Sequence, residues 1–248
     1  MNTLLRRGAA AALLGLGASL AQAATVNFTG WAYGDSWQNT VDVVSTNDPR
    51  ARDLGPAGAF AGSVGFVGNE GGFSGSLPGF VSYCVELTEF FYLPSGDMTG
   101  YRVVGGADYV EWDNANGTGK LAAQTAARLG QLLNYADTQG LIRSAADSTS
   151  LQLAIWNVVY DTDNSVTSGL FRERSGSRYD DYANTLLVDS ARWDRADDVS
   201  VLTKAGSQDF VLVRAAAVPE PASLALVALA LGAAGLATRR RQCPVTAA

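Results

Sequence analysis

The chain has 248 residues, no histidine and two cysteines, and its formal net charge is −6 at pH 7. The absence of histidine excludes a Ser-His-Asp triad, a Cys-His dyad and any zinc site with an imidazole ligand. Without the five arginines and one glutamate of the two ends, 13 basic and 23 acidic residues remain, a net charge of about −10. No stretch is basic enough to neutralise phosphates, so we expect no binding of nucleic acid.

The N-terminus has the three parts of a secretory signal peptide. A basic pair (Arg6 and Arg7) precedes an apolar stretch over residues 8–20, and Ala-Gln-Ala at 21–23 is a small-x-small cleavage site. We therefore predict that residues 1–23 are a signal peptide that is removed on export.

Residues 24 to about 101 have the pattern of β structure. Residues 25–31 alternate, 40–44 are β-branched, and 58–68 place small residues between larger apolar ones. Residues 79–87 are the best strand candidate, because β-branched and aromatic residues are bounded there by glycine and polar positions.

The pattern becomes helical after Gly119. Apolar residues recur at helical spacing over 120–136, a second helix begins near 148–150 and includes the apolar residues 151–160, and a third runs from 179 to about 193. Residues 199–202 and 210–213 return to strand. We predict an α+β fold with a β-sandwich or barrel-like core and a helical middle segment, in a single exported domain over residues 24–217.

The C-terminus carries a second targeting pattern. Pro219-Glu220-Pro221 precedes an apolar run over 222–238, which is followed by Arg239, Arg240 and Arg241. Residues 218–241 resemble the PEP-CTERM sorting tail of exported proteins of Gram-negative bacteria. The apolar run is too short and too rich in alanine for a permanent anchor, which needs about 20 apolar residues. The arginines would hold the end of the run on the cytoplasmic side of the membrane.

The PEP-CTERM resemblance implies a processing partner, a membrane anchor and a final location, and it leaves one thiol in the exported part. An exosortase-type membrane protease would cut near Pro219 to Pro221. The C-terminal transmembrane helix would anchor the chain transiently in the inner membrane. The mature protein would then lie at the cell surface or in the extracellular biofilm matrix. Cys84 would be the single thiol of the exported part, because Cys243 lies beyond the arginines.

Two further motifs stand far apart in the sequence. Tyr83-Cys84-Val85 lies in the predicted strand, and Leu151-Gln152-Leu153-Ala154-Ile155-Trp156 lies in the second predicted helix. Together they resemble the two signatures of bacterial thioester domains, an aromatic-Cys-apolar motif and an apolar-Gln-x-Ala-apolar-Trp motif. The residues that match the second motif are Leu151, Gln152, Ala154, Ile155 and Trp156. The resemblance implies that the Cys84 sulfur and the Gln152 side-chain carbonyl join as an internal thioester and release ammonia.

Such a bond needs a dry and ordered site. A primary amide is a poor electrophile, so the thiolate must be held close to Gln152 while water is excluded. We expect Tyr83 and Trp156 to shield the bond. A general base is also needed, and Asp161 and Glu86 are both candidates. No cofactor and no metal is implied.

Each of these residues alone has a simpler interpretation. A buried cysteine often behaves as a small hydrophobe, Gln152 could be solvated at the start of a helix, and Trp156 is most often a core residue. The combined pattern favours an exported surface protein that attaches once to an amine-bearing partner, for adhesion, and is not an enzyme. A non-covalent structural or carbohydrate-binding module is one alternative. A secreted glycoside-acting enzyme is the other, with a pair drawn from Glu86, Glu89, Asp97, Asp108, Glu111 and Asp113.

Overall fold

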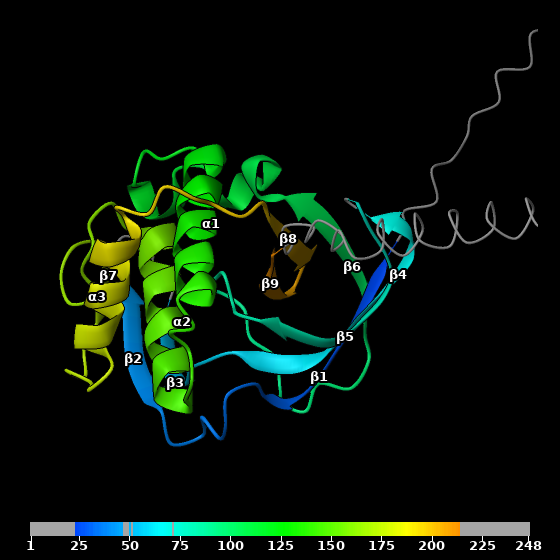
Figure 1. The fold of residues 1–248 in the computed structure, drawn as a ribbon, viewed down its shortest axis with the longest axis horizontal. Coiled ribbons are helices and arrows are strands. Elements are labelled where there is room, and N and C mark those ends of the chain that lie inside the picture. The colour runs from blue at the N-terminus through cyan, green and yellow to red at the C-terminus, as the bar shows by residue number, and fades with distance from the viewer. Residues whose placement is uncertain (1–22, 47–49, 51, 71, 214–248) are drawn as a thin grey trace, which may run out of the picture.

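The computed structural model describes residues 23–46, 50, 52–70 and 72–213 (Figure 1). The predicted sorting tail, and the predicted signal peptide except for Ala23, lie outside these residues. Within them, no helix combines the length and the apolar character needed to cross a membrane.

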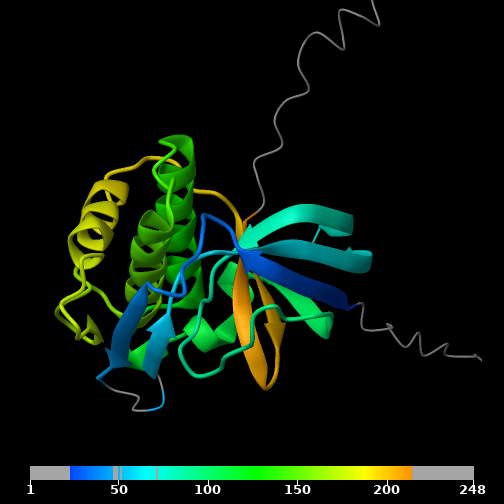
Figure 2. The same ribbon diagram turned by 90° about the horizontal axis from the view of Figure 1, so that it is seen from below.

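The larger sheet has six antiparallel strands in the order β5-β4-β1-β6-β8-β9. Alternation buries one face, as in β1, where Ala24, Val26 and Phe28 are fully buried and the residues between them are half-buried. The sheet curls strongly, so that β8 and β9 run across the direction of β4 and β5 (Figure 2). The strands are β1 (Ala24–Trp31), β4 (Phe60–Glu70), β5 (Phe73–Ser82), β6 (Met98–Gly105), β8 (Val199–Lys204) and β9 (Ser207–Val213).

The residues that follow β5 bring the two edges of this sheet together. The predicted strand over 79–87 differs from the structure, because β5 ends at Ser82 and Cys84 forms a single antiparallel bridge to Phe210 of β9. The Val211 N–H donates to the Tyr83 carbonyl (3.0 Å), and the Val85 N–H donates to the Asp209 carbonyl (3.1 Å). The curled sheet is thus joined along a short seam at residues 83–85.

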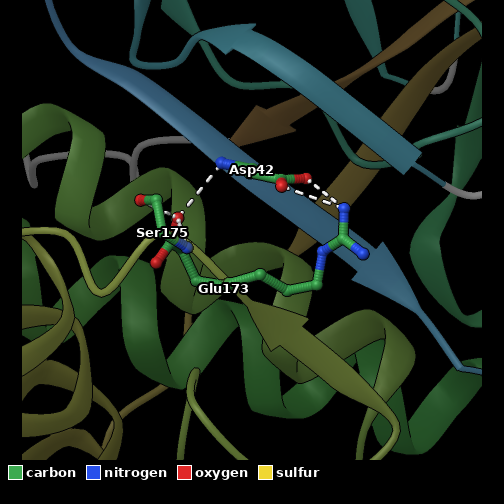
Figure 3. Close-up of polar contacts among 4 residues, drawn as sticks. Asp42, Glu173 and Ser175 are labelled. Carbon is green, nitrogen blue, oxygen red and sulfur yellow. Dashed lines mark hydrogen bonds and ion pairs between the residues drawn. The ribbon is translucent and has the colours of Figure 1, made fainter.

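A smaller sheet has the order β3-β2-β7, formed by β2 (Thr40–Ser45), β3 (Arg52–Pro56) and β7 (Phe171–Glu173). Arg174 binds the central strand of this sheet, because its Nη2 donates to both carboxylate oxygens of Asp42, at 2.9 Å each. Figure 3 shows that Glu173 also binds Asp42, because its carboxylate accepts from the Asp42 N–H (3.1 Å) and from Ser175. Burial raises the pKa of Glu173, but these hydrogen bonds outweigh burial and lower it below its usual value.

The helices gather on one side of the molecule, with α2 (Ala145–Tyr160) between α1 (Ala122–Thr138) and α3 (Asp180–Ser190) (Figures 1 and 2). The Ser144 side chain caps α2 by accepting from the Asp147 N–H (3.2 Å), so this helix begins earlier than predicted. Every residue of α2 from Ser148 to Tyr160 is buried, which explains its nearly continuous apolar run. Three short 3₁₀ helices precede α1: η1 (Gly106–Asp108), η2 (Val110–Trp112) and η3 (Ala115–Gly117).

The predicted class is confirmed in its coarse form. The described residues form a mixed α/β structure, in which a curled antiparallel sheet like half a barrel packs beside the helices of the middle segment. The finer prediction of a β-sandwich, and the domain bounds at residues 24 and 217, stay predictions.

Candidate functional site

Cys84 lies at the seam with one edge of its backbone turned away from β9. In an antiparallel pair, the N–H and C=O groups of successive residues point to opposite edges. Tyr83 and Val85 supply the groups that bind β9. The N–H and C=O of Cys84 therefore point to the other side, where α2 passes.

The side chain of Gln152 pairs with this backbone edge. The Cys84 N–H donates to Gln152 Oε1 (3.0 Å), and Gln152 Nε2 donates to the Cys84 carbonyl (2.8 Å). Cys84 is 7% exposed and Gln152 is 1% exposed, so the pair is nearly dry. A buried carboxamide with both ends bound is held in one orientation, and each such bond contributes about 1 kcal/mol.

The spacing of the second motif follows from how α2 lies along residues 84–87. Trp156 Nε1 donates to the Glu86 carbonyl (3.2 Å), and the Leu87 N–H donates to the Tyr160 hydroxyl (3.1 Å). Four helical residues rise about 6 Å, which is close to the length of about 6.6 Å for two extended residues. Gln152 therefore lies opposite Cys84 while Trp156 lies opposite Glu86.

Two cavities lie on either side of this segment. Cys84, Gln152 and Trp156 line one of about 430 Å³, together with Glu86. Tyr83 lines the other, of about 270 Å³, because neighbouring residues of an extended chain point to opposite faces.

The residues expected to shield the bond are therefore separated. Trp156 lies at the same cavity as Cys84 and Gln152, whereas Tyr83 packs on the opposite side. Three further residues of the second motif, Leu151, Ala154 and Ile155, are buried in the core of the helical side.

Of the two candidates for a general base, Glu86 is the one at the site. Burial, and then the charge of Asp209, raise the pKa of Glu86 to about 7, within the range suited to proton transfer at neutral pH. Asp161 lies at the far end of α2. Its carboxylate accepts from the backbone N–H groups of Thr162 (2.7 Å), Leu170 (2.5 Å) and Phe171 (2.8 Å), so it organises a loop.

Replacing Glu86 by glutamine is expected to make the stability of the protein less dependent on pH. The carboxyl group keeps its proton in the fold up to a pKa of about 7, against 4.5 ordinarily. The folded state then binds more protons, so the free energy of unfolding falls as pH rises between these two values. Asp209 acts in the same direction, because burial raises its pKa as well. In the Glu86→Gln variant, the free energy of unfolding should therefore still fall as pH rises, but by less than in wild type.

Thermal unfolding midpoints at about pH 5 and about pH 8 check this expectation. The Glu86 carboxylate accepts from the Thr88 hydroxyl and the Asp209 N–H, at 2.9 Å each. The titratable groups that interact with it are Glu89 in its own loop, Asp209 on β9, and the hydroxyls of Tyr101 and Tyr109. Glu111→Gln, at an exposed residue, is the control. Its unfolding midpoint should differ between the two pH values by as much as that of wild type. If wild type and Glu86→Gln showed the same difference in midpoint between the two pH values, the raised pKa assigned to Glu86 would be contradicted.

The other acidic candidates are dispersed. Glu86 and Glu89 line the larger cavity, whereas Asp97 accepts from the Asn27 side chain (2.6 Å) and Asp113 accepts from the Ala122 N–H (2.6 Å). Asp108 and Glu111 lie in η1 and η2. In the part of the chain that the structure describes, no three His, Cys, Asp or Glu side chains are grouped so as to hold a metal ion.

Sequence reasoning missed the aromatic wall of the larger cavity. Trp31 and Trp37 come from the end of β1 and the loop after it, and Phe90 and Tyr92 come from the loop after the seam. No sequence pattern joins these two segments. The run of three aromatic residues at 90–92 is the one sequence signal that could have indicated the second segment.

Comparison with known proteins identifies the C-terminal tail. Residues 217–241 match the PEP-CTERM protein-sorting motif. No curated protein and no solved structure matches the chain. The match covers the tail alone, so the resemblance of Cys84 and Gln152 to a thioester pair stays a prediction. The chain thus carries the C-terminal sorting signal of an exported protein, whose processing falls to an exosortase-type membrane protease.

Proposed function

We propose that this exported protein attaches covalently to an amine-bearing partner through a thioester between Cys84 and Gln152. The observation that carries the proposal is the pairing of the two residues in a nearly dry site. The Gln152 carboxamide is bound at both ends by the backbone of Cys84, at 3.0 Å and 2.8 Å. Both residues also line one cavity, so an incoming amine could reach them.

The bond would form by attack of the Cys84 sulfur on Gln152 Cδ. A C–S bond forms, the C–N bond of the carboxamide breaks, and the thiol proton leaves with the nitrogen as ammonia. Negative charge develops on Oε1 in this step, and the Cys84 N–H already donates to that oxygen. A donor placed in this way stabilises the charge without reorganisation. Glu86, at the same cavity, would take the thiol proton and pass it to the leaving nitrogen.

The partner would then react once. Its amine nitrogen forms an amide bond to Gln152 Cδ, the bond to sulfur breaks, and a proton of the amine returns to the thiolate. No step regenerates the thioester, so the protein is consumed and is not an enzyme. The sorting tail fits this role, because a protein that adheres at the cell surface or in the matrix of a Gram-negative bacterium must first be exported.

The intact mass of the exported domain tests the proposal. Wild type should weigh less than its sequence by one molecule of ammonia, and incubation with methylamine should add one methylamine to that species. Cys84→Ala and Gln152→Ala should both have the full sequence mass and bind no methylamine. The Cys84→Ala variant keeps its backbone N–H and C=O, so loss of reactivity there is not explained by loss of docking. A wild-type domain of full mass that ignores methylamine would end the proposal.

A glycoside-acting enzyme is the second candidate, and one observation favours it. Glu86 and Glu89 line the same cavity, and the pKa of Glu86, raised to about 7 by burial and by Asp209, suits a general acid. Hydrolysis of a glycan that is lost in Glu86→Gln and kept in Cys84→Ala would support this candidate. A non-covalent binding module would retain its ligand in both variants.

A further inference from the structure

The larger cavity has walls from four parts of the chain. Arg52 and residues 54–58 form one wall, and Glu86 to Leu93 form another, apart from Thr88. Trp31 and Trp37 close one end, and α2 contributes Gln152 and Trp156. Its volume of about 430 Å³ lies in the range of small-molecule pockets, about 300–1,000 Å³.

The exposed aromatic side chains of the described residues all belong to this cavity. Those with more than half of their surface exposed are Trp37 (52%), Phe90 (76%) and Tyr92 (81%), and all three line it. Large aromatic side chains left in contact with water in one place indicate a binding surface.

These aromatic side chains form two corners. The rings of Trp31 and Trp37 are 5.6 Å apart at 87°, and those of Phe90 and Tyr92 are 6.0 Å apart at 87°. Each corner therefore presents one ring face beside one ring edge. A saturated sugar ring such as a pyranose has a face of C–H bonds that can stack on such an aromatic face. The flexible stem of a lysine side chain needs one face alone.

Polar and charged side chains also line the cavity. Glu86 and Glu89 supply carboxylates that attract a cation, and Arg52 supplies donors for hydroxyl groups. The same cavity reaches Cys84 and Gln152. The ligand that this arrangement fits has sugar rings with an apolar C–H face, hydroxyl groups and a primary amine.

We infer that the cavity binds an amino sugar unit of a glycan and presents its amine to Gln152 Cδ. This inference rests on the proposed function and names the partner of the same site. The sugar ring stacks on the exposed aromatic side chains, and its ammonium group lies near Glu86 and Glu89. The Glu86 carboxylate takes one proton from the ammonium group. The amine nitrogen then forms an amide bond to Gln152 Cδ, the bond from Cδ to the Cys84 sulfur breaks, and a second proton of the nitrogen passes to that sulfur.

The test compares a chitosan oligosaccharide, its fully N-acetylated counterpart, a lysine peptide and methylamine as probes of the whole exported domain. Intact mass measures covalent capture by wild type, and calorimetry measures non-covalent binding to Cys84→Ala. Chitosan should react faster than methylamine, and the acetylated oligosaccharide should not react. Trp37→Ala and Tyr92→Ala should each weaken chitosan binding about tenfold and should slow the capture of chitosan more than the reaction with methylamine. Val188→Ala, on the exposed face of α3, is the matched control and should behave as wild type.

The outcomes separate the inference from the proposed function. If methylamine adds but chitosan has no advantage, or the lysine peptide reacts best, the inference is wrong and the thioester stands. If wild type has its full mass, the proposed function and the covalent step both fail. Recognition of the amino sugar is then tested on Cys84→Ala alone. Chitosan binding to this variant that is lost when Trp37→Ala is added supports recognition, and no chitosan binding to Cys84→Ala overturns it.

Discussion

Gln152→Glu is expected to destabilise the protein by about 3–5 kcal/mol at neutral pH, because it places an uncompensated charge in a buried site. The carboxylate can still accept from the Cys84 N–H, but it cannot donate to the Cys84 carbonyl as Nε2 does. A protonated carboxyl group can do both, so most of the loss should disappear at acidic pH. The fold would raise the pKa of the introduced carboxyl group, so the loss of stability that it causes grows as pH rises.

Urea unfolding at about pH 5 and about pH 8 measures this effect. Both the variant and its reference should carry Cys84→Ala, so that no covalent bond contributes. Gln124→Glu is the control, because Gln124 is exposed and its Oε1 accepts from the Leu121 N–H (2.9 Å), a bond that glutamate keeps. If Gln152→Glu were as stable as its reference at both pH values, the two hydrogen bonds would not be docking α2 to the seam.

Phe210→Ala is expected to lower the free energy of unfolding by about 3–5 kcal/mol, the range for a large aromatic removed from a core. Phe210 is fully buried and bridges to Cys84 across the seam. Its ring lies 4.7 Å from that of Phe28, 5.1 Å from that of Phe91 and 6.0 Å from that of Tyr101. The cavity left by its removal would lie beside Cys84, because directly opposite residues of an antiparallel bridge share one face.

The same urea measurement, at neutral pH, checks the second expectation. Val188→Ala removes a partly exposed side chain from α3 and should cost less than about 0.5 kcal/mol. Phe210→Leu fills most of the cavity and should recover much of the loss. If the proposed thioester forms, Phe210→Ala should also reduce the fraction of protein that lacks one ammonia. A loss of stability below about 1 kcal/mol would contradict the role given to the seam.

These expectations separate two roles of Gln152. Its bonds to Cys84 dock α2 against the seam, and this docking alone accounts for the spacing between Gln152 and Trp156. Thioester formation would use the same contact, because the carboxamide is already held against the cysteine. Stability in the Cys84→Ala background reports the docking, whereas intact mass reports the bond.

Much of the local structure was predictable because its signals are local. The helices α1, α2 and α3 were expected from apolar spacing, with ends misplaced by a few residues, since caps such as Ser144 compete with other hydroxyls nearby. β3 and β7 were not predicted. β3 contains Asp53, Gly55 and Pro56, residue types that are depleted in strands, and β7 has three residues. Both are held by pairing with β2, which no local pattern reports.

The sequence by itself determined the sorting signal at residues 217–241, the absence of histidine chemistry, and the two motifs around Cys84 and Gln152. Each depends on residue types at short spacing. Only the tertiary structure decided that Gln152 meets Cys84, 68 residues away, that Glu86 rather than Asp161 lies at the site, and that Tyr83 faces another cavity. The physical reason is that the seam, the docking of α2 and the aromatic wall all arise from contacts between segments distant in sequence, whose energies no single segment contains.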